Sequence, residues 1–190
     1  MLKDQERSFI NHSGMSQNKI RYYAGIGSRE TPPGVEPLIE ESAGFLGRFG
    51  FVLRSGGAPG ADSMFEKHCT GEMEIYLPWS KFNDNQSSFI LDNMDPDIVY
   101  KAREIAKKYH PGWSYLSPAA KKLMARNTFQ VLGYDLNTQI SFVVCWTREG
   151  KISGGTGQAL RIAKDMGIPI FNLFSKDCLH KLKVHITNLK

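Results

Sequence analysis

Residues 53–68, LRSGGAPGADSMFEKH, place a cluster of glycines between an apolar run and a helical pattern. Glycine has no Cβ and readily adopts positive φ, so another molecule can come close to its backbone. A glycine-rich turn at a helix start also exposes N–H groups that lack partners within the helix. A tight turn without a ligand is the alternative. We predict an anion site, above all for phosphate, formed by Ser55, Gly56, Gly57, Ala58 and Gly60.

Two carboxylates follow this turn. Asp62 and Glu66 are four residues apart and therefore share one face of the predicted helix. Asp62 would either stabilise the helix start or accept hydrogen bonds from sugar hydroxyls. Together the two carboxylates could divide acid and base or nucleophile roles on a glycosidic bond. We treat them as candidate catalytic residues, and the sequence leaves open whether the protein is an enzyme.

Two further glycine-rich turns carry groups that suit a phosphate. The first offers a hydroxyl from Ser28 and a guanidinium from Arg29, which can bind phosphate with two hydrogen bonds. The second offers Thr156, which could bind phosphate or cap the following helix. The predicted ligand-binding residues of these turns are Gly25, Gly27, Ser28, Arg29, Gly154, Gly155 and Thr156.

Three more polar or aromatic residues are ligand-binding candidates. Arg126 and Asn127 fall at the border of the apolar face of a helix, where an exposed Arg packed along its stem is the alternative. Trp146 ends an apolar run and would either stack on a base or join the core. His68 and His110 have no partner at metal-ligand spacing, so we expect neither a metal site nor another cofactor.

The periodicity of the chain predicts how these turns are positioned. Apolar runs predict strands at 20–24, 51–54, 74–78, 140–146 and 168–174, and helical spacing predicts helices at 35–50, 60–69, 98–110, 116–134 and 154–167. Residues 79–97 show no period, and the tail after 174 forms a short helix or strand. Strands alternating with helices predict an α/β fold, a doubly wound and mainly parallel sheet with helices on both faces. Ligands bind such sheets beyond the carboxyl ends of the strands, so the three glycine-rich turns should share one edge.

Length and composition bound the class of protein. The 190 residues suffice for one domain, which we place at 19–190 after a loose leader at 1–18. Lys and Arg number 24 against 19 acidic residues, and the resulting charge of +5 favours an anionic partner such as a nucleotide or nucleic acid. The cysteines Cys69, Cys145 and Cys178 are scattered, which argues against a disulfide framework. No signal peptide or membrane-spanning run is present, so we expect a cytoplasmic protein without a membrane partner.

Several segments together resemble the SLOG superfamily, which includes the DprA/Smf DNA-processing proteins and the Lonely Guy (LOG) phosphoribohydrolases. They are AGIGSRETP, LRSGGAPGADSMFE, IYLPW, ARNTFQVLG and VVCWTREGKISGGTGQAL, and the resemblance covers about residues 20–173. It is greatest for small stand-alone DprA-like proteins of phages and mobile elements. The resemblance implies a Rossmann-like fold, a bound nucleotide or nucleotide-derived phosphosugar, and a homo-oligomer, often a dimer.

The two branches of the superfamily imply different activities. A LOG-type enzyme hydrolyses the N-glycosidic bond of a nucleoside monophosphate, and Arg126 matches the Arg of that family. The catalytic Glu of its PGGxGTxxE signature falls on Ala159, so Asp62 or Glu66 would have to replace it. DprA-like proteins bind single-stranded DNA. Our main prediction is a nucleotide-binding sensor or sequestering module; an N-glycoside hydrolase and a single-stranded DNA-binding protein are the alternatives.

Overall fold

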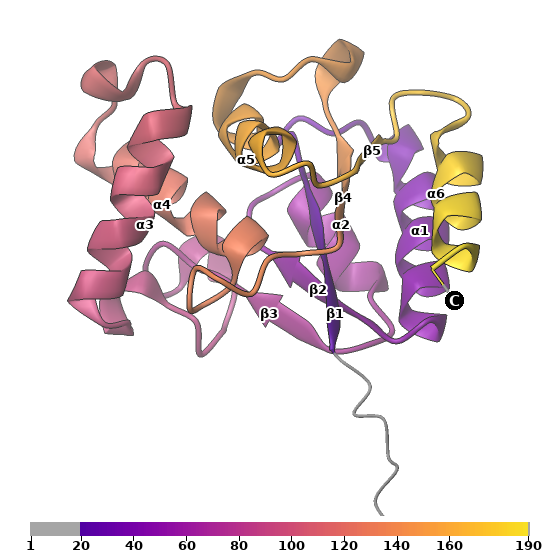
Figure 1. Ribbon diagram of the computed structural model, residues 1–190, viewed down its shortest axis with the longest axis horizontal. Coiled ribbons are helices and arrows are strands. Elements are labelled where there is room, and N and C mark those ends of the chain that lie inside the picture. Colours follow the sequence, from indigo (N-terminus) through magenta and orange to yellow (C-terminus); the bar gives the residue numbers. More distant parts are fainter. Residues whose placement is uncertain (1–19, 190) are drawn as a thin grey trace, which may run out of the picture.

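Five parallel strands form the sheet at the centre of the computed structural model, which describes residues 20–189 (Figure 1). The predicted leader at 1–18 lies outside the described residues. The strands are β1 (Arg21–Gly27), β2 (Phe51–Ser55), β3 (Met73–Ile75), β4 (Phe142–Trp146) and β5 (Ile170–Asn172), in the order β3-β2-β1-β4-β5. Every neighbouring pair is parallel. The predicted α/β class with a parallel sheet is confirmed.

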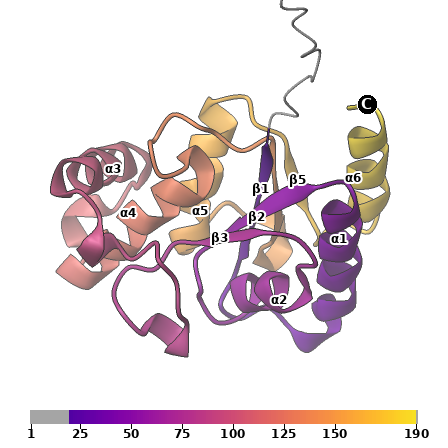
Figure 2. The same ribbon diagram turned by 90° about the horizontal axis from the view of Figure 1, so that it is seen from below.

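Helices cover both faces of this sheet (Figures 1 and 2). One face carries α1 (Glu36–Arg48), α2 (Ala61–His68) and α6 (Cys178–Thr187). The other carries α4 (Pro118–Leu132) and α5 (Gly154–Asp165), and α3 (Pro96–Tyr109) packs against these two helices on the outside. None of the described helices is long and apolar enough to cross a membrane.

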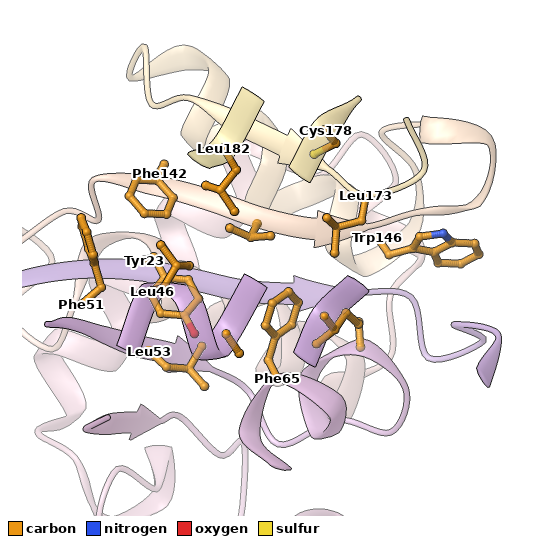
Figure 3. Close-up of a cluster of buried hydrophobic side chains, with 14 of the residues drawn as sticks. Tyr23, Leu46, Phe51, Leu53, Phe65, Phe142, Trp146, Leu173, Cys178 and Leu182 are labelled. Atoms are coloured by element: carbon orange, nitrogen blue, oxygen red, sulfur yellow. The ribbon is translucent and has the colours of Figure 1, made fainter. Parts of the chain in front are cut away.

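The strands alternate their side chains between two hydrophobic clusters. Tyr23 of β1 faces α1, α2 and α6, where its ring stacks on Phe142 at a centroid distance of 6.1 Å (Figure 3). Its neighbour Ala24 faces the cluster under α4 and α5. Because the sheet is covered on both sides, β2 and β4 are buried along their whole length. This explains the short, continuously apolar runs in the sequence.

Several elements differ in extent from the sequence prediction. β1 continues to Gly27, beyond the predicted 20–24. β3 and β5 are shorter than the apolar runs 74–78 and 168–174. Beyond β3 the chain leaves the sheet, and Leu77 pairs with the segment at Phe89 and Ile90 instead. Residues 79–97 contain two 3-10 turns, Phe82–Asp84 and Leu91–Asn93, and the tail forms α6. The two 3-10 turns are too short to show a period in the sequence.

The carboxyl ends of the central strands meet at one edge, as the alternation of elements predicts. Gly27 at the end of β1 is in register with Trp146 at the end of β4. The N–H of Ser28 donates to the carbonyl of Trp146 at 3.0 Å, and the N–H of Ala61 donates to the carbonyl of Ser28 at 3.2 Å. The turn after β1 is thus tied to β4 and to the start of α2. The glycine-rich turns converge at this edge.

Candidate functional site

A cleft of about 510 Å³ opens at this edge, between the turn after β1, the helix α4 and the start of α5. Ten of the predicted site residues line it: Gly27, Ser28, Arg29, Ala58, Asp62, Arg126, Asn127, Gly154, Gly155 and Thr156. Its volume lies within the range of small-molecule sites. The sequence therefore locates about half of the residues that line the cleft.

Seven predicted residues lie outside the cleft lining: Gly25, Ser55, Gly56, Gly57, Gly60, Glu66 and Trp146. Gly25 is inside β1, where a Cβ would lie 2.7 Å from atoms of Leu53 and Phe65. Trp146 belongs to the hydrophobic cluster under α1, α2 and α6, which is the core alternative raised by the sequence (Figure 3). These residues shape the edge of the sheet without lining the cleft.

Backbone N–H groups of the turn after β2 bind two carboxylates of the protein itself. The N–H of Gly56 donates to Oδ2 of Asp62 at 3.2 Å, and the N–H of Gly57 donates to Oε1 of Glu66 at 2.9 Å. Both carboxylates come from α2, directly after the turn. The backbone groups that the sequence suggested for an external phosphate are thus satisfied by internal carboxylates.

Asp62 joins three elements. Its side chain is 4% exposed and accepts hydrogen bonds from the N–H groups of Gly27 and Gly56, each at 3.2 Å. Arg126 Nη1 and Gln130 Nε2 of α4 each lie 3.4 Å from Oδ2. Burial raises the pKa of Asp62, while the charge of Arg126 and the backbone donors oppose this effect. These contacts make Asp62 the link between β1, β2 and α4.

Glu66 joins the same turn to the segment between β3 and α3. It accepts hydrogen bonds from Gly57 and from Nδ2 of Asn85, the latter at 2.7 Å. Burial raises the pKa of Glu66, and the hydroxyl of Ser55 opposes this shift. The candidate catalytic pair is thus divided, since Asp62 reaches the cleft and Glu66 does not line it.

Among the described residues, backbone N–H groups without an acceptor lie at the start of α5. Within the part of the chain that the structure describes, the N–H groups of Gly154, Gly155 and Thr156 have no hydrogen-bond acceptor. Ser153, at the N-cap, makes no side-chain capping bond. Unpaired N–H groups at a helix N-terminus attract anions, and the helix dipole adds to this attraction. The backbone N–H groups at the start of α5 are therefore available to an anion.

Two side chains predicted to bind ligand also hold this helix start in place. Oγ1 of Thr156 donates to the carbonyl of Gly27 at 2.7 Å, which ties α5 to β1. Nδ2 of Asn127 donates to the carbonyl of Gly155 at 3.0 Å, which ties α5 to α4. Both bonds use side chains and leave the N–H groups of α5 open toward the cleft.

Three arginines line the cleft with these N–H groups. Arg29 and Arg148 are exposed, whereas Arg126 is 4% exposed and its Nε has no hydrogen-bond partner in the described structure. Burial lowers the pKa of Arg126; Asp62 opposes this effect and the charge of Arg29 adds to it. Glu30 and Asp62 are the acidic lining residues. The cleft thus combines an excess of guanidinium groups with an open helix N-terminus, a combination suited to phosphate.

Sequence reasoning missed several lining residues, among them the polar Gln130, Arg148 and Ser153. Arg148 follows β4 at the carboxyl edge, and Ser153 directly precedes the glycines of α5, so strand and helix boundaries contained a signal for both. Gln130 lies one helical turn after Arg126 and gave no separate signal. Among the described residues, no group of three His, Cys, Asp or Glu side chains is arranged to hold a metal ion.

Comparison with known proteins places this cleft in a recognised fold. No protein-family model matches the chain, and no curated protein matches its sequence. Two solved structures match. The chain has the fold of DNA processing protein A.

The first match is DNA processing protein A from Helicobacter pylori, with a TM-score of 0.54, 19% identity and coverage of 89% of this chain and 80% of that chain. That structure describes a single-stranded DNA binding mode. The second is DNA processing protein A (DprA) from Streptococcus pneumoniae, with a TM-score of 0.52, 19% identity and coverage of 87% of this chain. This chain spans 56% of the length of the S. pneumoniae chain. At this identity the likeness establishes the fold.

Proposed function

We propose that the cleft binds single-stranded DNA through its phosphate groups. The observation that carries this proposal is the juxtaposition of the unpaired N–H groups of α5 with Arg29, Arg126 and Arg148. A phosphate oxygen accepts hydrogen bonds from both kinds of donor. The DprA fold supports this choice, because the H. pylori relative binds single-stranded DNA.

A nucleotide is the second candidate, and the size of the cleft favours it. A volume of about 510 Å³ accommodates one nucleotide with its base and sugar. The same donors would then hold a terminal phosphate. No observation favours hydrolysis of its N-glycosidic bond, because Ala159 lines the cleft where the LOG signature has its Glu and Asp62 is held by backbone donors.

The experiment compares the two ligands on one protein. Fluorescence anisotropy would measure the affinity for oligothymidylates of increasing length, and the same protein would be titrated with nucleoside monophosphates. Single-stranded DNA binding predicts affinity that grows with length and falls steeply with salt. Preferential binding of a monophosphate, with no gain from added nucleotides, would instead support the nucleotide candidate.

Exposed arginines provide the matched variants. Arg29→Gln and Arg148→Gln should each weaken binding, whereas Arg103→Gln, on an exposed part of α3 outside the cleft, should leave it unchanged. Equal losses for all three variants would indicate that binding follows the net charge of +5 rather than the cleft.

The resemblance to small stand-alone DprA-like proteins of phages adds two expectations. We infer that the chain acts in the cytoplasm and as a homo-oligomer, with the dimer as the simplest form. Light scattering coupled to size-exclusion chromatography tests the second expectation, and a monomer at working concentration would contradict it.

A further inference from the structure

We propose that Phe82 is a positioning residue for the cleft: its ring holds the guanidinium groups of Arg29 and Arg126 together as one anion-binding pair. This inference rests on the proposed function, because it concerns how the same cleft binds phosphate. Phe82 lies in the segment between β3 and α3, which showed no periodicity in the sequence. It is not among the residues that line the cleft.

The geometry of three side chains carries the proposal. The Cζ atom of Arg29 lies 5.9 Å from the centroid of the Phe82 ring, and that of Arg126 lies 5.7 Å from the same centroid. Both distances fall within the range of cation–π attraction. Arg29 comes from the turn after β1 and Arg126 from the middle of α4. One ring thus contacts guanidinium groups from two distant parts of the chain.

The contact with the ring offsets a repulsion between two like charges in the cleft. Arg29 and Arg126 repel each other, as the effect of Arg29 on the pKa of Arg126 shows. The negative face of an aromatic ring attracts each cation and so offsets part of this repulsion. Without the ring, the exposed Arg29 would be free to turn toward solvent. With it, both groups stay near the position where a phosphate would bind.

The backbone around Phe82 is itself held in place. Lys81, Asn83 and Asp84 adopt positive φ values of 58°, 52° and 53°, which non-glycine residues rarely do. Nδ2 of Asn83 donates to the carbonyl of Gly57 at 3.0 Å, and Asn85 donates to Glu66. These bonds fasten the segment to the turn after β2 and to α2. The contacts offset the cost of the unusual backbone and fix where the ring lies.

Hydrophobic packing also holds the Phe82 ring in place. Its ring is 9% exposed and meets Trp79 edge-on at a centroid distance of 5.3 Å. Ala58, Ile75 and Leu77 are the other buried members of the hydrophobic cluster around it. The ring therefore has a fixed support on one side and the two guanidinium groups within reach.

The test compares Phe82→Leu, which removes the ring and keeps an apolar side chain, with Phe82→Tyr, which keeps the ring. Affinity for an oligothymidylate is measured at several salt concentrations. Phe82→Leu should weaken binding about fivefold to tenfold at low salt and reduce the salt slope by about one phosphate contact. Phe82→Tyr should bind like the unmodified protein. A merely structural loss would lower the active fraction and leave the salt slope unchanged, which would overturn the proposal.

Phe45→Leu is the matched control. The Phe45 ring, on α1, also lies near two cations, with Arg48 Cζ at 6.0 Å and Lys183 Nζ at 5.8 Å. It does not line the cleft, so its loss should leave both affinity and salt slope unchanged.

A measurement without DNA separates this proposal from the proposed function. The Nε–H signals of Arg29 and Arg126 in a ¹⁵N spectrum should shift in Phe82→Leu, because the ring current is lost, and should stay in place in Phe45→Leu. If the unmodified protein binds no DNA, the proposed function fails and these signals alone decide the role of Phe82. Unmoved arginine signals in Phe82→Leu would overturn the positioning role, whatever the protein binds.

Discussion

The carboxylate of Asp62 lies 3.4 Å from Nη1 of Arg126, and both side chains are buried in the wall of the cleft. The pair connects α2 with α4 across the carboxyl ends of β1 and β2. Asp62 also neutralises part of the charge of Arg126 while leaving its Nε without a partner. The pair therefore supports the fold and at the same time fixes the cation that an anionic ligand would meet.

Removing the charge of Asp62 should destabilise the protein strongly. Asp62→Asn would leave Arg126 buried without its counter-ion and would set an amide NH₂ against one of the N–H donors of Gly27 and Gly56. We expect a loss of about 3–5 kcal/mol in the free energy of unfolding, as for other broken buried ion pairs. Urea denaturation monitored by circular dichroism measures it.

Asp92→Asn is the control, because Asp92 pairs with Lys122 at the surface. Surface pairs contribute about 1 kcal/mol or less, so this variant should remain close to the unmodified protein. An Asp62→Asn protein that is fully stable yet has lost an activity would contradict the structural role and favour a catalytic one.

The fold could be predicted from the sequence because its signals are local. The apolar run before Trp146 and the glycine turns each lie within a few residues of the element they define. The alternation of strands and helices then allows few arrangements, and the parallel sheet follows. The same locality identified Arg29 and the glycines of α5 as cleft residues.

The roles within the site could not be predicted, since they depend on contacts between distant residues. The sequence shows that Asp62 and Gly56 are six residues apart, but not that the carboxylate of Asp62 accepts a hydrogen bond from the N–H of Gly56. Nor does it show that Arg126, 64 residues further along the chain, pairs with the same carboxylate. Phe82 lies in a segment without periodicity, and its two guanidinium partners come from elsewhere in the chain. Such pairings are decided by packing, which a local pattern does not contain.

Arg54 gives a second case of a long-range pairing, inside the sheet. It is 2% exposed inside β2, where Nε bonds Glu74 at 2.7 Å and the guanidinium lies 3.7 Å from the centroid of the Tyr22 ring. Arg54→Met should cost about 3 kcal/mol of unfolding free energy, because Glu74, which is 20% exposed, loses its ion-pair partner and keeps only the hydrogen bond from Tyr76. Urea denaturation measures this loss. The control is Arg48→Met, because Arg48 is exposed; its free energy of unfolding should change by less than about 1 kcal/mol. Equal effects for the two variants would contradict a special role for the buried pair.

Glu66 predicts a pH dependence of stability. Its pKa is raised in the folded protein above the ordinary value of 4.5. As the pH falls, the folded state therefore takes up a proton at a higher pH than the unfolded state does. Stability from this group is fully present below pH 4.5 and is lost as pH rises through the folded pKa. The difference in unfolding free energy between the unmodified protein and Glu66→Gln should therefore shift in favour of the unmodified protein as pH falls from neutral. A difference that is constant with pH would contradict the raised pKa.

Ser153 allows the anion site at α5 to be filled from within the protein. Its backbone is in the extended region typical of an N-cap, and its side chain makes no capping bond. In Ser153→Asp the new carboxylate would accept hydrogen bonds from the open N–H groups and favour the helix dipole, which should stabilise the protein by about 0.5–1 kcal/mol. It would also occupy the donors proposed for phosphate, so DNA affinity should fall at least about tenfold. Ser153→Asn caps the helix without a charge and should lose less affinity for a similar gain in stability. If Ser153→Asp is more stable but binds DNA as before, the phosphate does not bind at the start of α5, and the arginines alone must account for binding.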